Sequence, residues 1–208
     1  MNTLNTLPLE LPNAEEYPEA FADMMDEPVM ITEFLYGRDW AVTASRHAVD
    51  PKSAIVTVVQ FGNQIRAIED ERAYNEGGFD YMLRSIMATA PQEVETITLR
   101  GVFTYPDYYA RSGSRGAVWL YDIELNGEPM DARHVFQIFS AFVVPHVPLL
   151  SAPGETLYGW MNRRPIPDAA EGWSKLAPIQ RRGIVVRPTE EKTHPSVGRL
   201  LLKALPRK

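Results

Sequence analysis

The stretch that decides the fold is RRGIVVRP, residues 181–188. Gly183 would begin a short strand, the run Ile-Val-Val consists of β-branched residues that favour extended backbone, and Pro188 would end the strand. Arginines flank it on both sides, Arg181 and Arg182 before it and Arg187 after it. A buried type of strand bracketed by cations raises the question of which anions those cations meet.

Outward from this stretch, the hydrophobic pattern predicts a mixture of strands and helices. Further strands are predicted at residues 28–36, 39–48, 53–62, 95–105, 116–127 and 198–205, where apolar and β-branched residues cluster or alternate. Helical spacing is found at residues 15–26, 78–90 and 131–142, the last with Asp131 as the expected N-cap. The sum is an α+β domain built mainly on antiparallel sheet with flanking helices.

The size and composition set bounds on the class of protein. The chain has 208 residues, which suits one medium domain or two lobes that share a core, so we expect a single domain over 1–208 with 1–27 as a lead-in. Cysteine is absent, so there is no disulfide framework and no thiolate metal site. The N-terminus lacks the pattern of a signal peptide, and no run of about 20 apolar residues would span a membrane. We therefore expect a cytoplasmic protein that does not contact membranes.

The charge is distributed unevenly along the chain. Residues 1–160 contain 10 Lys/Arg and 23 Asp/Glu, a net charge of −13, whereas residues 161–208 contain 11 Lys/Arg and 4 Asp/Glu, a net charge of +7. A basic C-terminal quarter would attract phosphates, or it would pack against the acidic remainder of the same chain. The sequence leaves both interpretations open.

The order of the motifs resembles the nucleotidyltransferase domain of the ATP-dependent RNA ligases, in the phage and bacterial branch. The most specific part is GIVVRP at 183–188 followed by GRLLLK at 198–203, which matches the family pattern Gly-(Val/Ile)-Val-(Val/Ile)-Arg-Pro and Gly-Arg-x-x-x-Lys. The resemblance covers roughly residues 28–205 and implies a two-lobe, ATP-grasp-like domain. Neither an OB-type domain nor a C-terminal helical appendage fits in the length.

The catalytic positions of that family are changed. The nucleophilic lysine of Lys-x-x-Gly aligns with Phe34 in FLYG, with Gly37 kept, and phenylalanine has no lone pair for a phosphoramidate. The glutamate of a second motif aligns with Val102, and the metal-directed glutamate aligns with Arg182, which would repel a divalent cation. These changes together predict a pseudoenzyme with no catalytic residue and no metal.

The resemblance and the cationic residues give two sets of binding candidates. The candidates for a nucleotide or phosphate are Gly37, Arg66, Trp119, Tyr121, Arg182, Arg187 and Lys203. Either Trp119 or Tyr121 would stack on a base, unless both serve only packing. Arg182 with Lys203 would hold a phosphate without Mg²⁺, unless Arg182 pairs with an acidic neighbour and closes the pocket. The candidates for nucleic acid are Arg111, Arg115 and Arg199.

Three hypotheses of function follow. The first is an inactive, RNA-ligase-like binding module without cofactor, which recognises a nucleotide, a nucleic-acid end or a protein partner. Such a module would suit a phage-encoded accessory or counter-defence protein in the host cytoplasm. The second is an active nucleotidyltransferase that uses ATP, Mg²⁺ and a displaced lysine, Lys52 or Lys203. The third is a structural subunit or an inhibitor of a larger complex. The oligomeric state is left open.

Overall fold

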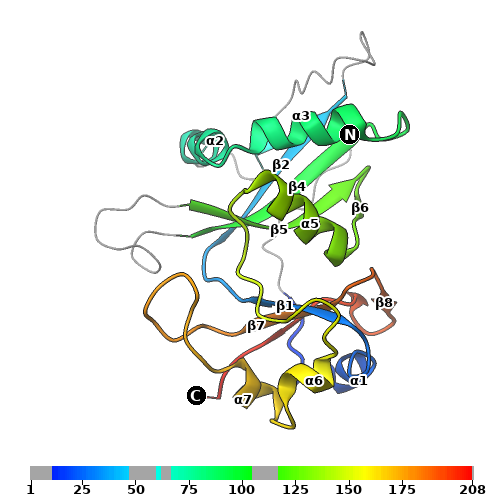
Figure 1. Ribbon diagram of the computed structural model, residues 1–208, viewed down its shortest axis with the longest axis vertical. Helices are drawn as coiled ribbons and strands as arrows, with labels where there is room; N and C mark the ends of the chain where they lie inside the picture. Colours follow the sequence, from blue (N-terminus) through cyan, green and yellow to red (C-terminus); the bar gives the residue numbers. More distant parts are fainter. Residues whose placement is uncertain (1–10, 47–59, 62–66, 105–116, 208) are drawn as a thin grey trace.

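The computed structural model describes residues 11–46, 60–61, 67–104 and 117–207. Its strands form two sheets that face each other across the middle of the molecule, and a small hairpin (Figure 1). The larger sheet has the order β3 (Gln60–Phe61), β2 (Arg38–Ser45), β4 (Thr96–Thr104), β5 (Ala117–Leu125) and β6 (Glu128–Pro129). The smaller sheet has the order β1 (Val29–Glu33), β7 (Ile184–Pro188) and β10 (Leu202–Ala204), and the hairpin pairs β8 (Thr193–His194) with β9 (Gly198–Arg199). All named strand pairs are antiparallel.

Helices pack against each sheet, with α2 and α3 on the outer side of the large one and α5 on the side that faces the small lobe, so that the molecule has two lobes (Figure 1). The large lobe contains the five-stranded sheet with α2 (Ala67–Glu76), α3 (Phe79–Thr89) and α5 (Ala132–Phe142). The small lobe contains the three-stranded sheet with α1 (Pro18–Ala22), α6 (Leu157–Met161) and α7 (Ile166–Ala170). Each lobe has its own cluster of buried apolar side chains. The small lobe is assembled from both ends of the described chain, so the two lobes cannot be separated by one cut in the sequence.

The alternation of side chains along the small sheet decides which residues face the large lobe. Ile184 and Val186 of β7 are buried in the small-lobe core. Val185 and Arg187 lie on the opposite face, because successive residues of a strand point to opposite sides. In the same way, Lys203 of β10 points away from the core that holds its neighbours. The face that the lobes enclose therefore carries Arg187 and Lys203.

Both edges of the small sheet are covered by other segments of the chain. Along β1, Val29 N donates to Glu155 O, and Leu150 N donates to Ile31 O. Along β10, the backbone of Asn13 pairs with that of Lys203 in a parallel bridge. The smaller sheet is therefore closed on both sides by irregular segments instead of further strands.

The predicted fold class is confirmed, and several predicted elements need correction. The helix predicted at 15–26 is only α1, and the strand predicted at 198–205 is divided into β9 and β10, because Leu200 N turns to donate to Lys192 O. Of the strand predicted at 53–62, only β3 lies within the described residues. The sequence analysis missed α2, α6 and α7. In the part of the chain that the structure describes, no helix combines the length and apolarity that crossing a bilayer requires.

Candidate functional site

A pocket of about 240 Å³ lies where the two lobes meet. It is lined by residues at the positions that the RNA-ligase resemblance singles out, namely Phe34, Gly37, Val102, Tyr121 and Lys203. The loop that follows β1 supplies the first two, the large sheet supplies Val102 and Tyr121, and β10 supplies Lys203. The topology thus brings four distant parts of the sequence to one cavity.

The walls of this pocket are mainly apolar. Leu11, Phe136, Val147, Val185 and Leu201 contribute alongside the residues already named. Phe34 stands at the position of the family nucleophile, and its backbone N–H donates to Gly183 O at 3.0 Å. Since neither Phe34 nor Val102 has a group that could act as nucleophile or metal ligand, this side of the pocket offers contact surface and no covalent chemistry.

Two glycines that match the family pattern have packing reasons to be glycine. A Cβ on Gly37 would lie 2.3 Å from Phe103 O of β4. Gly183 has a φ of +150°, and a Cβ there would lie 2.5 Å from Ala204 O of β10. Both glycines allow backbones to approach closely. Their presence is therefore explained by the fold and does not depend on catalysis.

The two aromatic candidates of β5 differ in their place in the sheet, because Trp119 pairs with Val102 of β4, whereas Tyr121 lies at the register shift between Leu120 and Asp122. Tyr121 lines the pocket, whereas Trp119 is not among the lining residues and its Nε1 donates to Thr104 Oγ1 at 3.1 Å. Burial raises the pKa of Tyr121, and the nearby Asp39 carboxylate raises it further, so its hydroxyl stays protonated. Tyr121 is thus the aromatic side chain of β5 that a ligand in the pocket would meet.

The arginines that bracket β7 meet groups of this same chain. Arg181 donates to Ala169 O at 3.1 Å and to Ala170 O at 2.8 Å, at the C-terminal end of α7. Arg182 is exposed, and its guanidinium carbon lies 5.9 Å from the centre of the Tyr36 ring. Arg187 is buried and forms an ion pair with Asp122. Arg181 therefore meets neutral carbonyl oxygens at the end of a helix, Arg187 meets a carboxylate, and Arg182 is the one of the three that is exposed.

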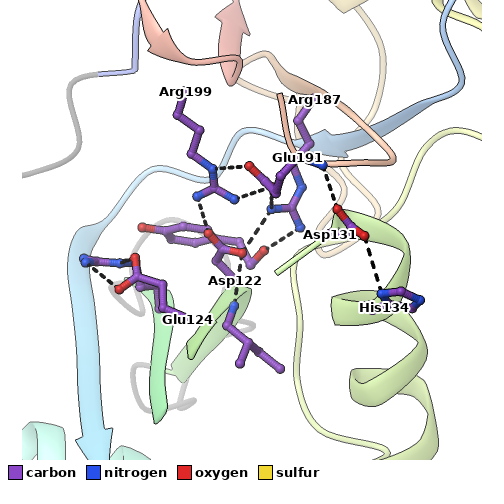
Figure 2. A network of polar contacts seen from close by, with 10 residues as sticks. Asp122, Glu124, Asp131, His134, Arg187, Glu191 and Arg199 are labelled. Atoms are coloured by element: carbon purple, nitrogen blue, oxygen red, sulfur yellow. Dashed lines mark hydrogen bonds and ion pairs between the residues drawn. The ribbon is translucent and has the colours of Figure 1, made fainter. Parts of the chain in front are cut away.

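The ion pair of Arg187 belongs to a larger group, here called the Asp122 network, which consists of Asp122, Arg187, Glu191 and Arg199 (Figure 2). Arg187 Nη1 lies 3.1 Å from Asp122 Oδ1, and Arg199 contacts Asp122 Oδ2. Arg199 also donates two hydrogen bonds to the Glu191 carboxylate, of 2.6 Å and 2.8 Å. Asp122 is 0% exposed and comes from the large sheet, whereas the other three residues come from the small lobe and its hairpin. The network therefore joins the lobes.

Arg199 is held by this network as a structural cation. Burial by itself would lower the pKa of Arg199, but the hydrogen bond to Glu191 and the charge of Asp122 more than offset it and raise that pKa. The guanidinium group of Arg199 donates hydrogen bonds to two carboxylates, with Nε bound to Glu191 and Nη1 bound to Asp122. This geometry favours a role inside the protein over the contact with nucleic acid that the sequence suggested.

Sequence analysis missed Asp122 and misassigned the role of Asp131. The signal for Asp122 was a lone carboxylate inside the apolar run WLYDI, since a buried carboxylate needs a cationic partner. Asp131 does occupy the N-cap position of α5, but its side chain makes no capping hydrogen bond. Instead, Asp131 Oδ1 accepts from Glu191 N at 2.7 Å and holds the loop that carries the network (Figure 2).

Glu33 ends β1 beside the pocket and is almost fully buried. One carboxylate oxygen accepts from Lys175 N at 3.0 Å, and the charge of Glu33 acts on Arg181. The other oxygen has no hydrogen-bond partner among the described residues. Glu33 thus fixes the segment that follows α7 against the end of β1.

A second, wider groove of about 650 Å³ lies on the other side of Leu11, Tyr121 and Leu201, which line both cavities. Its charged residues include the ion pair of Arg100 and Glu124, and Glu124 is labelled beside the Asp122 network in Figure 2. Acidic and basic groups are mixed along this groove, so it shows no preference for one sign of charge.

Several candidates cannot be placed. Arg66, Arg111, Arg115 and Lys52 lie outside the described residues. Within the described ranges, no group of three or more His, Asp or Glu side chains is arranged to hold a metal ion. Among the described lysines, Lys203 is the one that lines the pocket.

Comparison with known proteins supports the fold. Solved structures of the RNA ligase of Naegleria gruberi match 99% of this chain: a mutant form with AMP and Mn at a TM-score of 0.65 and 13% identity, an apo mutant form at 0.63 and 14%, and the form with PPi at 0.64 and 13%. The match covers 57% of each of those chains, so this chain spans less than two thirds of their length. No protein-family model and no curated protein matches the sequence.

The molecule therefore has the nucleotidyltransferase fold of the RNA ligases. At this level of identity the likeness concerns the fold alone. The assignment to a phage or bacterial branch and the loss of catalytic motifs stay predictions from the sequence.

Proposed function

We propose that the protein is a catalytically inactive, RNA-ligase-like binding module whose interlobe pocket takes a nucleotide, either free or as the 5′ end of a nucleic acid. The observation that carries this proposal is the state of Lys203. It lies in a mainly apolar pocket, and no described residue accepts a hydrogen bond from its ammonium group. A cation without a hydrogen-bond partner favours an anionic ligand, and it does so here in a pocket that the carboxylates Glu33 and Asp39 also line.

The rest of the pocket suits the organic part of a nucleotide. Tyr121 and Phe34 offer aromatic surface for a base, and Val102, Val147 and Leu201 add apolar contact. Arg187 also lines the pocket, but its charge is already balanced by Asp122. Lys203 is thus the residue assigned to the phosphate, and binding would not need a divalent cation.

The first experiment measures binding of AMP by calorimetry, with EDTA present, to the unmodified protein and to Lys203→Met. A hydrogen bond to a charged group contributes about 1.5–3 kcal/mol, so we expect the variant to bind AMP about 10- to 100-fold more weakly. Lys192→Met is the matched control, because Lys192 is exposed and pairs with Glu27 outside the pocket. Equal loss in both variants, or strict dependence on Mg²⁺, would contradict the proposal.

The rival function is an active nucleotidyltransferase with a displaced nucleophile. The position of Lys203 in the pocket is the observation that favours it. Intact-mass spectrometry after incubation with ATP, Mg²⁺ or Mn²⁺, and a 5′-phosphorylated RNA separates the two functions. We expect no gain of one AMP. A gain that peptide mapping assigns to Lys203 would establish the enzyme and end the pseudoenzyme proposal.

A further inference from the structure

The segment between α7 and β7 exposes an unusual amount of aromatic and cationic surface beside the pocket. Trp173 is 66% exposed and Tyr36 is 53% exposed. Arg182 is exposed as well. Exposed apolar surface that gathers into a patch rimmed by polar residues marks an interaction site.

These side chains lie along one continuous face. Trp173 and Gln180 are paired in an antiparallel bridge, and the segment is further joined by a hydrogen bond of 2.8 Å from Arg181 N to Gly172 O. Gln180 and Arg182 are exposed, whereas Arg181 between them turns inward to the end of α7. Arg182 in turn lies over the ring of Tyr36. We call Trp173, Gln180, Arg182 and Tyr36 the Trp173–Tyr36 face.

The face leads into the pocket, because Tyr36 also lines that cavity. Arg182 gives the face a positive charge, and Trp173, Gln180 and Arg182 belong to the part of the chain from residue 161 onward, which has a net charge of +7. Aromatic rings and guanidinium planes in sequence along an extended segment are the surface on which successive unpaired bases stack and a phosphate backbone is neutralised.

We propose that the Trp173–Tyr36 face binds single-stranded nucleic acid, with bases stacked on Trp173 and Tyr36 and a phosphate on Arg182. The proposal rests on the proposed function in one respect only, namely that the terminal nucleotide of the strand enters the pocket. It places the contact on residues other than Arg111, Arg115 and Arg199.

The test is a titration of the whole protein with 5′-phosphorylated hexa-adenylate RNA that carries a fluorophore at its 3′ end, followed by anisotropy. Loss of one stacking side chain weakens binding about 5- to 150-fold, so Trp173→Ala should fall in that range. Arg182→Ala should lower the slope of log K against log salt concentration by about 0.7. Tyr81→Ala is the control, since Tyr81 is 72% exposed on α3 of the other lobe. It should bind RNA like the unmodified protein.

Each outcome is decisive. Unchanged affinity in both Trp173→Ala and Arg182→Ala would overturn the proposal, and so would equal binding of poly-glutamate at the same salt concentration, which would point to an acidic protein partner. Calorimetry with AMP keeps the two proposals apart. Trp173→Ala should bind AMP as the unmodified protein does. If RNA binding depends on Trp173 and AMP does not bind, the proposal for the Trp173–Tyr36 face is supported and the proposal for the pocket is rejected.

Discussion

In the Asp122 network, buried acidic and basic groups are matched with each other, whereas in the adjoining pocket Lys203 meets no described acceptor. Both regions lie between the same two lobes, and Arg187 borders both. Buried charge is expensive unless it is paired. The difference therefore separates cations whose charge is balanced inside the protein from the cation to which we assign a ligand in the proposed function.

The largest expected effect comes from removing the centre of the network. Asp122→Ala leaves Arg187 with only the more distant carboxylate of Glu191, at 3.9 Å, and Arg199 with one carboxylate instead of two. Breaking a buried pair in this way costs about 3–5 kcal/mol of the free energy of unfolding, which urea denaturation measures. Glu128→Ala, an exposed acidic residue on β6, is the control and should change stability by less than about 0.5 kcal/mol. Similar losses in the two variants would show that the network does not hold the lobes.

A smaller effect is expected for the residue that both regions share. Arg187→Met keeps apolar bulk and leaves Asp122 paired with Arg199, so we expect a loss of about 1–3 kcal/mol in the free energy of unfolding. The affinity for AMP, measured by calorimetry, should stay within about threefold of that of the unmodified protein, because the charge of Arg187 is already balanced by Asp122. Loss of AMP binding without loss of stability would show that Arg187 binds the ligand, and the contrast between the Asp122 network and the pocket would then fail.

The smallest effect is expected for an exposed ion pair. Asp80 accepts a hydrogen bond of 2.7 Å from Arg84 on α3, and both side chains are about half exposed. The hydrogen bond with Arg84 lowers the pKa of Asp80 below its ordinary value of 3.8. Because the folded-state pKa is the lower one, the contribution to stability is present above about pH 4 and is lost as the pH falls through the folded pKa.

Solvent screening keeps that contribution small. Asp80→Asn should cost less than about 1 kcal/mol at pH 7 and less again at pH 2, as measured by denaturation at the two pH values. A cost comparable to that of Asp122→Ala would mean that burial does not distinguish the two kinds of pair.

The elements that could be predicted are those whose side chains alternate or recur strongly. Strand β7 and helix α3 were found because β-branched runs and a regular apolar stripe leave a clear pattern. Helix α2 was missed because its sequence AIEDERAYNE is mostly polar. Helix α6 has only five residues, and its one local signal was Thr156, whose side chain accepts from Gly159 N.

The site could be predicted only in part. The motif positions Phe34, Gly37, Val102, Tyr121 and Lys203 line one pocket, and their role in binding stays a prediction. The partners of Asp122 lie 65 and 77 positions away in the sequence, and no local pattern reports pairings of that range. For the same reason the sequence does not predict that Arg187 and Arg199 form ion pairs with carboxylates, whereas Lys203 has no such partner among the described residues.

The covered edges of the small sheet have a consequence for how the protein behaves at high concentration. An exposed strand edge offers unpaired backbone groups to other molecules and promotes aggregation. Residues 12–14 cover the β10 edge here, through the pairing of Asn13 with Lys203 and the hydrogen bond from Ala14 N to Lys203 O. A version of the chain that begins after Ala14 would leave β10 open, and its molecules would be expected to associate edge to edge.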